Sequence, residues 1–268
     1  MALKAGDILI REKKKGIQKL KVETKSSKID LVTNADKASE KSIITNIKRK
    51  FPDHGIIAEE SENDFMKKME ELSHCSYIWI IDPLDGTTNF TYGLPQYSVS
   101  IGLMKVNQAK KSKNFEYFEG ELVAGVVYAP ELDQMFYAEK GKGAFLNRKK
   151  IATSKTKSLA MSLLATGFAY SNKEKNLPYL EAMIPHCRDL RRFGSAALDL
   201  CYVAAGNFDG YWEFGLKPWD IAAGSLIVAE AGGKVSDLNG NLLDLFGEEI
   251  LCSNGKVHKE MVKVFSEI

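Results

Sequence analysis

The sequence predicts a mixed α/β protein, and two patterns of apolar residues support that prediction. Residues 77–81 (YIWII) form an unbroken run of β-branched and aromatic residues, which is typical of a strand buried on both faces. Beyond residue 158, strand-like segments at about 163–166 and 209–214 alternate with helical patterns. The chain has 268 residues, of which 44% are hydrophobic, so it can bury a substantial core as one large domain or two joined halves. We expect two halves, residues 1–152 and 153–268, that together form one unit.

Composition and charge exclude several classes of protein. The net charge is only +2 with 27% charged residues, and a bulk nucleic-acid binder is normally more basic, so we expect no nucleic-acid partner. The four cysteines and four histidines are scattered without the spacings of a metal site, which argues against a disulfide framework and a zinc centre. No signal peptide is visible, and no apolar run approaches the ~18 to 20 residues of a membrane span. We therefore expect a soluble, cytoplasmic protein that does not contact a membrane.

The beginning of the chain predicts two helices. Helical spacing of apolar residues from residue 2 to about 18 predicts a first helix that ends near Gly16. A second helix is predicted up to about Lys50, with a short strand-like segment between them. In the stretch DLVTNAD, Thr33 or Asn34 is suited to cap the second helix, which puts Asp36 in its first turn. The ordinary explanation of Asp36 is an acid that the helix dipole favours.

The stretch DPLDGTTNF, residues 82–90, holds the most specific chemistry. It sets Asp82 and Asp85 at the carboxyl end of the buried strand, where Pro83 should end the ladder and Gly86 can adopt a positive φ. Thr87, Thr88 and Asn89 are suited to cap a short helix whose backbone donors face the same place. Carboxylates suit a hard cation and backbone amides suit an anion, and a metal-bound phosphate needs both. The alternative is a plain Asp-Gly turn after a strand.

Acids also stand at the ends of other predicted elements. Glu59 and Glu60 follow a short strand, although a pair of glutamates on a loop usually faces solvent. Glu213 ends another strand, and its ordinary explanation is an ion pair with Lys217. Asp220 lies in the first turn of a helix, where an acid is more often a cap than a ligand.

The remaining segments carry less functional information. Strands are predicted at about 98–105, 121–129 and 134–138, and the loop 107–118 between the first two is interpreted as a solvated hairpin tip. The glycine-rich turn 141–147 lacks the GxGxxG spacing and a following helix, so we exclude a dinucleotide-binding fingerprint. Two more helices are expected, one over residues 173–186 and one that Ser195 caps.

Four stretches together resemble the inositol monophosphatase family of metal-dependent phosphomonoesterases. They are DPLDGTTNF, the DLVT–x–x–D element at residues 30–36, the EES element at 59–61 and WDIAAG at 219–224. The resemblance covers nearly the whole chain, with Ala58 where glycine is usual and a first helix that begins late. It implies a layered α/β/α/β/α sandwich of the inositol monophosphatase and fructose-1,6-bisphosphatase type, with a mixed sheet in the first half and a second sheet after about residue 153. It also implies a homodimer.

The resemblance further implies the roles of individual residues. All-oxygen ligation without histidine or cysteine indicates Mg²⁺, two or three ions, with Mn²⁺ as the alternative. The implied metal ligands are Glu59, Asp82, the Leu84 carbonyl, Asp85, Thr87 and Asp220. The implied catalytic residues are Thr87 and Asp36, which activate the attacking water, with Glu60 as a supporting acid. The implied substrate-binding residues are Asp85, Gly86, Thr87, Thr88, Gly194, Ser195, Ala196 and Glu213.

These roles predict the hydrolysis of a small phosphorylated polyol, most directly inositol 1-phosphate, by metal-activated water and with sensitivity to lithium. Two alternatives stay open. One is a related phosphatase that acts on fructose 1,6-bisphosphate or NADP(H). The other is a non-catalytic regulatory protein with the same fold, whose signature would be a lost ligand, and none of the expected ligands is lost.

Overall fold

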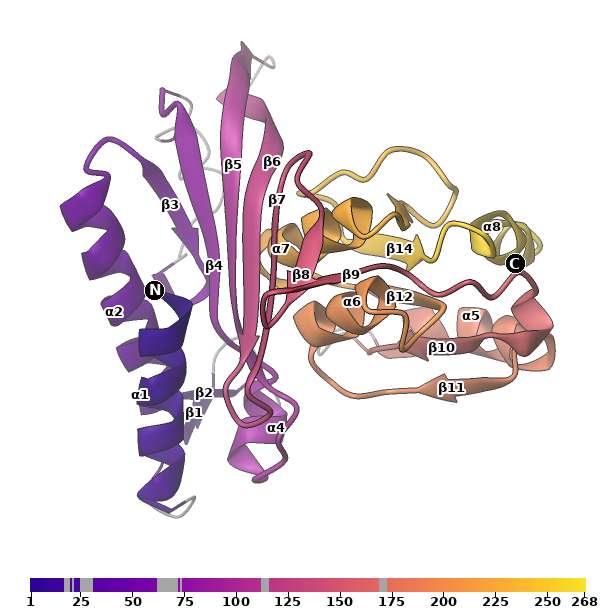
Figure 1. Ribbon diagram of the computed structural model, residues 1–268, viewed down its shortest axis with the longest axis horizontal. Helices are drawn as coiled ribbons and strands as arrows, with labels where there is room; N and C mark the ends of the chain where they lie inside the picture. Colours follow the sequence, from indigo (N-terminus) through magenta and orange to yellow (C-terminus); the bar gives the residue numbers. More distant parts are fainter. Residues whose placement is uncertain are drawn as a thin grey trace.

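Two β-sheets and three layers of helices alternate through the protein (Figure 1). The computed structural model describes residues 1–16, 20, 22–24, 31–61, 72, 74–111, 116–168 and 173–268. From one side to the other, the layers are a helix pair, the larger sheet, a second helix pair, the smaller sheet and a third helix pair. The expected α/β/α/β/α sandwich is therefore confirmed. The division into halves at residue 152 stays a prediction.

The larger sheet is mixed and holds the buried central strand. Its seven strands follow the order β3-β4-β5-β6-β7-β8-β9, and only the β3–β4 pair is parallel. The strands are β3 (Gly55–Ala58), β4 (Tyr77–Asp85), β5 (Ser98–Lys111), β6 (Glu116–Ala129), β7 (Gln134–Glu139), β8 (Ala144–Leu146) and β9 (Lys149–Ile151). Helices α1 (Ala2–Lys14) and α2 (Asn34–Lys50) cover its outer face, beside the small β1 (Val22–Thr24) and β2 (Leu31–Thr33) pair.

The smaller sheet has five strands in the order β11-β10-β12-β14-β13. They are β10 (Leu163–Thr166), β11 (Asp189–Arg191), β12 (Gly210–Phe214), β13 (Lys234–Ser236) and β14 (Glu249–Ser253). Helices α6 (Ala196–Ala204) and α7 (Pro218–Glu230) lie between the two sheets, and α5 (Leu177–Met183) and α8 (His258–Phe265) cover the far face. Short helices complete the described chain: η2 (Glu59–Ser61), α4 (Thr87–Thr91), η3 (Leu159–Met161), η4 (Lys173–Asn176) and η5 (Ile184–His186).

Helix α7 packs against the larger sheet through small residues, and this packing positions the start of the helix. A side-chain carbon at Gly102 would lie 2.9 Å from the Cβ of Ala222, and one at Gly125 would lie 2.9 Å from the carbonyl oxygen of Ala223. Any larger residue at these two strand positions would push the helix away from the sheet. The close approach places the first turn of α7 beside the carboxyl end of β4.

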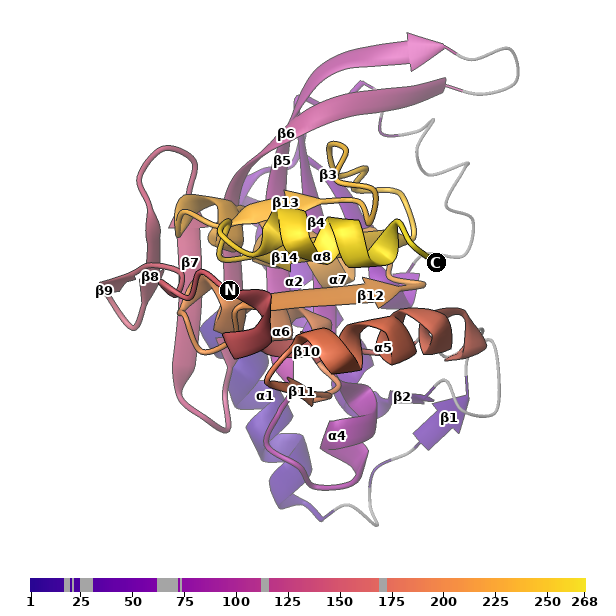
Figure 2. The same ribbon diagram turned by 90° about the vertical axis from the view of Figure 1, so that its right-hand side faces the viewer.

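Three sequence predictions about local structure are wrong in detail. Strands β5 and β6 continue to Lys111 and from Glu116, so most of the predicted loop 107–118 is a paired two-stranded arm that extends beyond the sheet (Figure 2). The ladder of β4 continues past Pro83 to Asp85, because a register shift accommodates the proline. The helix predicted over 173–186 is divided into η4, α5 and η5, and Pro185 explains the second division. The end of the first helix at Lys14 is close to the predicted end near Gly16.

Other observations concern surface and membrane properties. Most of residues 62–76, a polar stretch that the sequence predicts to be loop-like or briefly helical, lie outside the described residues. Within the described part of the chain, none of the helices has the length and apolar character that a membrane crossing requires.

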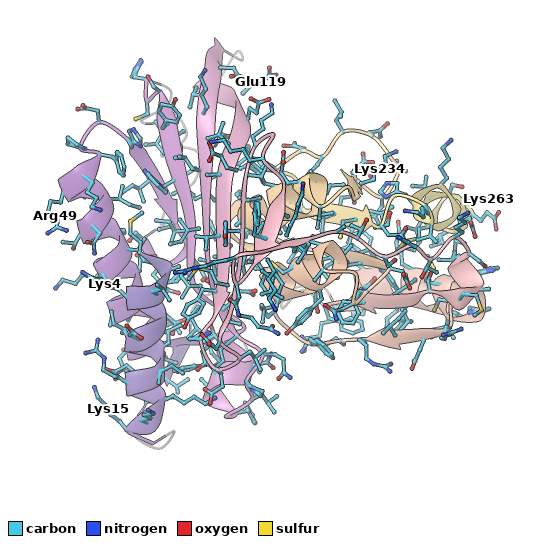
Figure 3. All side chains as sticks on the ribbon, in the orientation of Figure 1. Lys4, Lys15, Arg49, Glu119, Lys234 and Lys263 are labelled. Carbon is cyan, nitrogen blue, oxygen red and sulfur yellow. The ribbon has the colours of Figure 1, made fainter. Side chains whose placement is uncertain are left out.

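The basic side chains of Lys4, Arg49, Lys234 and Lys263 point outward from different elements at both sides of the molecule (Figure 3).

Candidate active site

The turn at the end of β4 gathers the first two acids of the site. Asp82 is buried, and its Oδ1 accepts a hydrogen bond of 2.8 Å from the backbone N–H of Leu84, which closes the turn. Gly86 follows with φ +89°, and a side-chain carbon there would lie 2.9 Å from the carbonyl oxygen of Gln96. Glycine is therefore required at this position for two reasons, backbone conformation and space. The result is that the carboxylates of Asp82 and Asp85 lie together at one end of the sheet.

Asp220 joins these two acids from the start of α7. One carboxylate oxygen from each of Asp82, Asp85 and Asp220 lies within 4.8 Å of the others. Asp220 also accepts a hydrogen bond of 2.7 Å from the backbone N–H of Lys217, so it caps its helix while it faces the other acids. Glu59, at the end of β3, comes within hydrogen-bonding range of Asp82. Four acids from three elements, η2, β4 and α7, therefore lie close together, as the family resemblance implied.

Burial makes this group of acids costly to ionise. Burial raises the pKa of Asp82 well above its usual range, and the negative charge of Glu59 raises it further. The pKa of Asp220 is also raised, by burial and by the negative charge of Asp85. Burial raises the pKa of Asp85 to about 6, although a hydrogen bond from Ser195 opposes the shift. Divalent cations would relieve this repulsion, and an all-carboxylate donor set fits Mg²⁺ or Mn²⁺.

Thr87 and Asp36 form a second arrangement beside the acids. The Thr87 hydroxyl lies 3.0 Å from Asp36 Oδ1 and 3.0 Å from the carbonyl oxygen of Leu84, so its single proton can be donated to only one of them. The other carboxylate oxygen of Asp36 accepts hydrogen bonds from the backbone N–H of Thr33, at 2.8 Å, and from its hydroxyl, at 2.6 Å. This capping box fixes a fully buried carboxylate against Thr87. Thr33 is thus the cap of α2, one of the two residues predicted.

Asp85 connects the end of β4 to helix α6. Its Oδ2 accepts hydrogen bonds from the Ser195 hydroxyl and, at 2.9 Å, from the backbone N–H of Ala197. Ser195 occupies the N-cap position of α6, but its side chain makes no capping hydrogen bond. The predicted capping by Ser195 is therefore wrong, because the carboxylate of Asp85 satisfies the helix N-terminus instead. Asn89 adds a second link, since its amide donates to the carbonyl of Phe193 at 2.7 Å.

Glu213 lies at the other end of the site, on β12. Its carboxylate is buried and accepts a hydrogen bond from the Tyr211 hydroxyl. Burial raises the pKa of Glu213 to about 7, opposed by that hydrogen bond and by the positive charge of Arg192. The expected structural alternative, an ion pair with Lys217, is wrong, because the Lys217 ammonium pairs with Glu248 at 3.4 Å. Glu213 is thus a buried acid that does not pair with Lys217.

A pocket of about 120 Å³ brings most of the predicted residues together. Its walls include ten of them: Glu59, Asp82, Leu84, Asp85, Gly86, Thr87, Gly194, Ala196, Glu213 and Asp220. Asp36 and Ser195 lie behind the wall, in contact with Thr87 and Asp85. Glu60 and Thr88 do not line the pocket.

Several residues of the site escaped the sequence analysis. Phe168 and Arg192 line the pocket, and Gly167 lies against Glu213 so closely that a side chain there would overlap the carboxylate. No motif marks these three positions. Glu40 accepts hydrogen bonds from the Glu60 N–H, at 2.8 Å, and from the Ser61 hydroxyl, and thereby holds the turn that carries Glu59. Its position four residues after Asp36, on the same helix face, was a signal for it.

Comparisons with known proteins agree with this geometry. The sequence profile described as the inositol monophosphatase family matches residues 1–268. The Nus factor SuhB of Pasteurella multocida is 42% identical over 97% of this chain and 91% of its own length. The inositol-1-monophosphatase of a Synechocystis species is 44% identical over 87% of this chain and 75% of its own length. A crystal structure of the suhB protein from Bartonella henselae superposes with a TM-score of 0.86 at 36% identity, covering 99% of this chain and 95% of the other. The chain therefore belongs to the inositol monophosphatase family.

Proposed function

We propose that this protein hydrolyses a small phosphate monoester with the help of Mg²⁺, and that inositol 1-phosphate is its leading substrate. The observation that supports this most directly is the meeting of Asp82, Asp85 and Asp220 in one pocket wall, next to the Thr87–Asp36 pair. Uncatalysed hydrolysis of phosphate monoesters is extremely slow, so a catalyst must neutralise dense negative charge and position a water molecule. The pocket contains residue types suited to both tasks.

The acids of the site are proposed to hold the cations. Glu59, Asp82, the Leu84 carbonyl and Thr87 would share one ion, and Asp82, Asp85 and Asp220 a second. When bound, the ions supply an activated water and stabilise the negative charge of the phosphate and of the leaving alcohol. Glu40 supports this arrangement because it fixes the turn from which Glu59 projects.

Thr87 and Asp36 are proposed to orient and deprotonate the attacking water. When the Thr87 hydroxyl donates its proton to the fixed carboxylate of Asp36, its lone pairs face the pocket and can accept a hydrogen bond from water. The water's proton can then pass through Thr87 toward Asp36, whose other oxygen stays bound to Thr33. Glu60 lies outside the pocket wall, and its proposed part is limited to supporting the 59–61 turn.

The leaving alcohol is proposed to lie against Glu213. A carboxylate accepts hydrogen bonds from hydroxyl groups, which suits a polyol, and Ser195 and Ala196 border the same region. Backbone amides of Gly86, Thr87 and Thr88 would bind the phosphate oxygens. Fructose 1,6-bisphosphate and NADP(H) remain alternative substrates of the same chemistry.

A substrate panel assayed for released phosphate tests this proposal. Inositol 1-phosphate should be hydrolysed in Mg²⁺ and not in excess EDTA, because the acids need the cation in order to bind a phosphate. Asp82→Asn should lose activity, whereas Asp53→Asn, which makes the same change at an exposed turn, should not. Full activity of the purified protein in EDTA, or activity on none of the phosphate esters in Mg²⁺ or Mn²⁺, would contradict the proposal.

Three further properties belong to the same proposal: inhibition by Li⁺, a homodimer and a cytoplasmic location. We also propose that hydrolysis needs no nucleic-acid partner, since the net charge of the chain is only +2. The relative from Pasteurella multocida is named a Nus factor. A regulatory protein without turnover is the remaining alternative, and the phosphate-release assay decides it.

A further inference from the structure

A buried asparagine at the start of α5 joins the two strand ends that lead into the alcohol end of the pocket. Asn176 is 1% exposed and occupies the N-cap position of α5, but its side chain makes no capping hydrogen bond. Its amide nitrogen instead donates to the Gly167 carbonyl at 2.7 Å and to the Thr166 hydroxyl at 2.9 Å. Its amide oxygen accepts a hydrogen bond of 2.7 Å from Trp212 Nε1. The polar atoms of this side chain are thus used on the sheet and not on the helix.

These hydrogen bonds close a ring across the end of the β10–β12 pair. Thr166 and Trp212 are the last register partners of the two parallel strands, and the Thr166 hydroxyl donates to the Trp212 carbonyl at 2.8 Å. The side chains of Thr166, Asn176 and Trp212 are almost completely buried. A buried network whose polar groups are paired is rigid, because breaking one bond leaves an unpaired group away from water. The ring therefore fixes the backbone at the point where both strands reach the pocket.

The residues that follow the ring belong to the pocket wall. Gly167 lies beyond the paired part of β10, and Asn176 holds its carbonyl there. Glu213 is the next residue after the ring on β12, and a side-chain carbon at Gly167 would overlap its carboxylate. Phe168 and Glu213 line the pocket, whereas Asn176 lies outside it. Asn176 thus holds backbone against the Glu213 carboxylate without reaching the space where a substrate would bind.

We propose that Asn176 is a positioning residue, which fixes the orientation of the Glu213 carboxylate and thereby the preference of the pocket for phosphate esters of polyols. This inference rests on the proposed function and adds a residue that acts on the substrate through another. The Tyr211 hydroxyl donates to Glu213 Oε2, so the phenol and the Gly167 backbone together leave Oε1 to accept hydrogen bonds from substrate hydroxyl groups. Without Asn176 the Gly167 backbone can withdraw, the carboxylate gains other orientations, and its hydrogen bonds to the hydroxyl groups weaken.

A second buried asparagine provides a matched control. Asn254 is also 1% exposed, and its amide nitrogen donates to the Ser154 hydroxyl and to the Thr156 carbonyl, each at 2.8 Å. Its amide oxygen accepts hydrogen bonds from two backbone N–H groups. Asn254 follows Ser253, which is the register partner of Gly210 at the opposite end of β12. The two asparagines therefore make networks of the same kind, and only that of Asn176 lies at the pocket end of the strand.

Selectivity between two substrates tests this assignment on the full chain. The measured quantity is the kcat/KM for inositol 1-phosphate, or for the polyol phosphate that the substrate panel favours, divided by that for 4-nitrophenyl phosphate in Mg²⁺. Asn176→Ala should lower this ratio about tenfold, mainly through KM for the polyol phosphate, because the hydrogen bonds to its hydroxyl groups weaken. Thr166→Val removes one hydroxyl from the ring and should lower the ratio less. Asn254→Ala should leave the ratio unchanged, even where it lowers the melting temperature.

The background of Glu213→Ala separates positioning from a purely structural role. There Asn176→Ala should lower the ratio no further, because the carboxylate through which it acts is gone. An unchanged ratio in Asn176→Ala overturns the proposal, as does an equal fall in Asn254→Ala or an additive fall in the Glu213→Ala background. If Asn176→Ala does not fold, Thr166→Val decides, and an unchanged ratio in that variant overturns the proposal.

A stability measurement keeps the inference distinct from the proposed function. If the wild type hydrolyses no phosphate ester, the proposed function fails, and urea unfolding at pH 8 measures the positioning role instead. Glu213→Gln should then stabilise the wild type, and this gain should fall by about half in the Asn176→Ala background, because water reaches the carboxylate once Gly167 withdraws. In the Asn254→Ala background the gain should persist. An equal gain with and without Asn176, or no gain in the wild type, overturns the proposal.

Discussion

The two ends of the pocket are built in different ways. At the metal end, Asp82, Asp85 and Thr87 come from one strand, turn and helix, and only Glu59, Asp36 and Asp220 are supplied from elsewhere. At the alcohol end, the wall is assembled from segments that are separate in sequence, around residues 167–168, 192–196 and 211–216. The residues proposed to act on the phosphate thus lie mostly in one local motif, whereas those proposed to contact the alcohol part of the substrate are brought together by tertiary packing.

This difference predicts how the two ends respond to mutation. Changes at the metal end should reduce turnover of every substrate alike, because every substrate carries the phosphate that is attacked. Changes at the alcohol end should alter selectivity between substrates. The experiments below test that contrast, beginning with the largest expected effect.

Asp220→Asn should lower kcat on all substrates by about two to three orders of magnitude, because a proposed metal ligand is lost. The same change should raise the melting temperature of the protein in EDTA, since it removes a partly buried acid that the neighbouring carboxylates repel. Phosphate release and thermal unfolding measure the two effects. A variant that loses both activity and metal-free stability would indicate that Asp220 serves only as the cap of α7.

Thr87→Ala should lower kcat about a hundredfold with little change in KM, because its proposed role is to orient water. Asp36→Asn should behave similarly, and the double variant should cost little more than either single one. Steady-state kinetics of the wild type, the two single variants and the double variant measure these losses. Thr91→Ala removes a hydroxyl from the same short helix and serves as the control. Fully additive losses would show that Thr87 and Asp36 act independently.

Glu213→Gln should stabilise the protein at alkaline pH. The pKa of Glu213 rises from 4.5 to about 7 on folding, so the neutral acid is favoured in the folded state. The contribution of protonated Glu213 to the free energy of unfolding is therefore fully present below pH 4.5, and it is lost as the pH rises through about 7. At pH 8 the variant should therefore exceed the wild type by about 2 kcal/mol in free energy of unfolding, at roughly 1.4 kcal/mol per pKa unit with some screening. Urea titrations at pH 4 and pH 8 measure this, and a difference that is equal at both values would refute the ionisation argument.

Gly167→Ala should reduce kcat/KM for inositol 1-phosphate about tenfold, while 4-nitrophenyl phosphate, which lacks the hydroxyl groups, is affected less. The new methyl group would occupy the place of the Glu213 carboxylate and displace it. In a Glu213→Ala background the same substitution should cost nothing further, because the obstructed carboxylate is gone. Additive losses would place the effect of Gly167 outside the substrate pocket.

The meeting of Asp82 and Asp85 could be predicted from the sequence because one local turn carries both, whereas Glu59, Asp36 and Asp220 were placed beside them only through the family resemblance. Pro83, Gly86 and the acids around them constrain the turn through backbone geometry that residue types reveal directly. The long β5–β6 arm was interpreted as a loop because its polar composition hides the pairing that neighbouring strands impose. Gly167 and Arg192 were missed because their importance arises from residues that are distant in sequence. For the same reason, the sequence of α6 alone could not predict that Asp85, rather than Ser195, accepts the hydrogen bond at the start of this helix.

The hydrogen bonds of Asp85 to Ser195 and Ala197 have a consequence for biosynthesis. The two partners lie 110 and 112 residues further along the chain, so they leave the ribosome long after Asp85. Until then the carboxylate has neither its hydroxyl donor nor the helix N-terminus that orients it. The contact of Asp85 with Ser195 and Ala197 joins residues that are far apart in sequence. We therefore expect it to form late in folding, when the second sheet docks on the first. A nascent chain truncated before residue 195 therefore contains most of the motif and cannot yet contain the site.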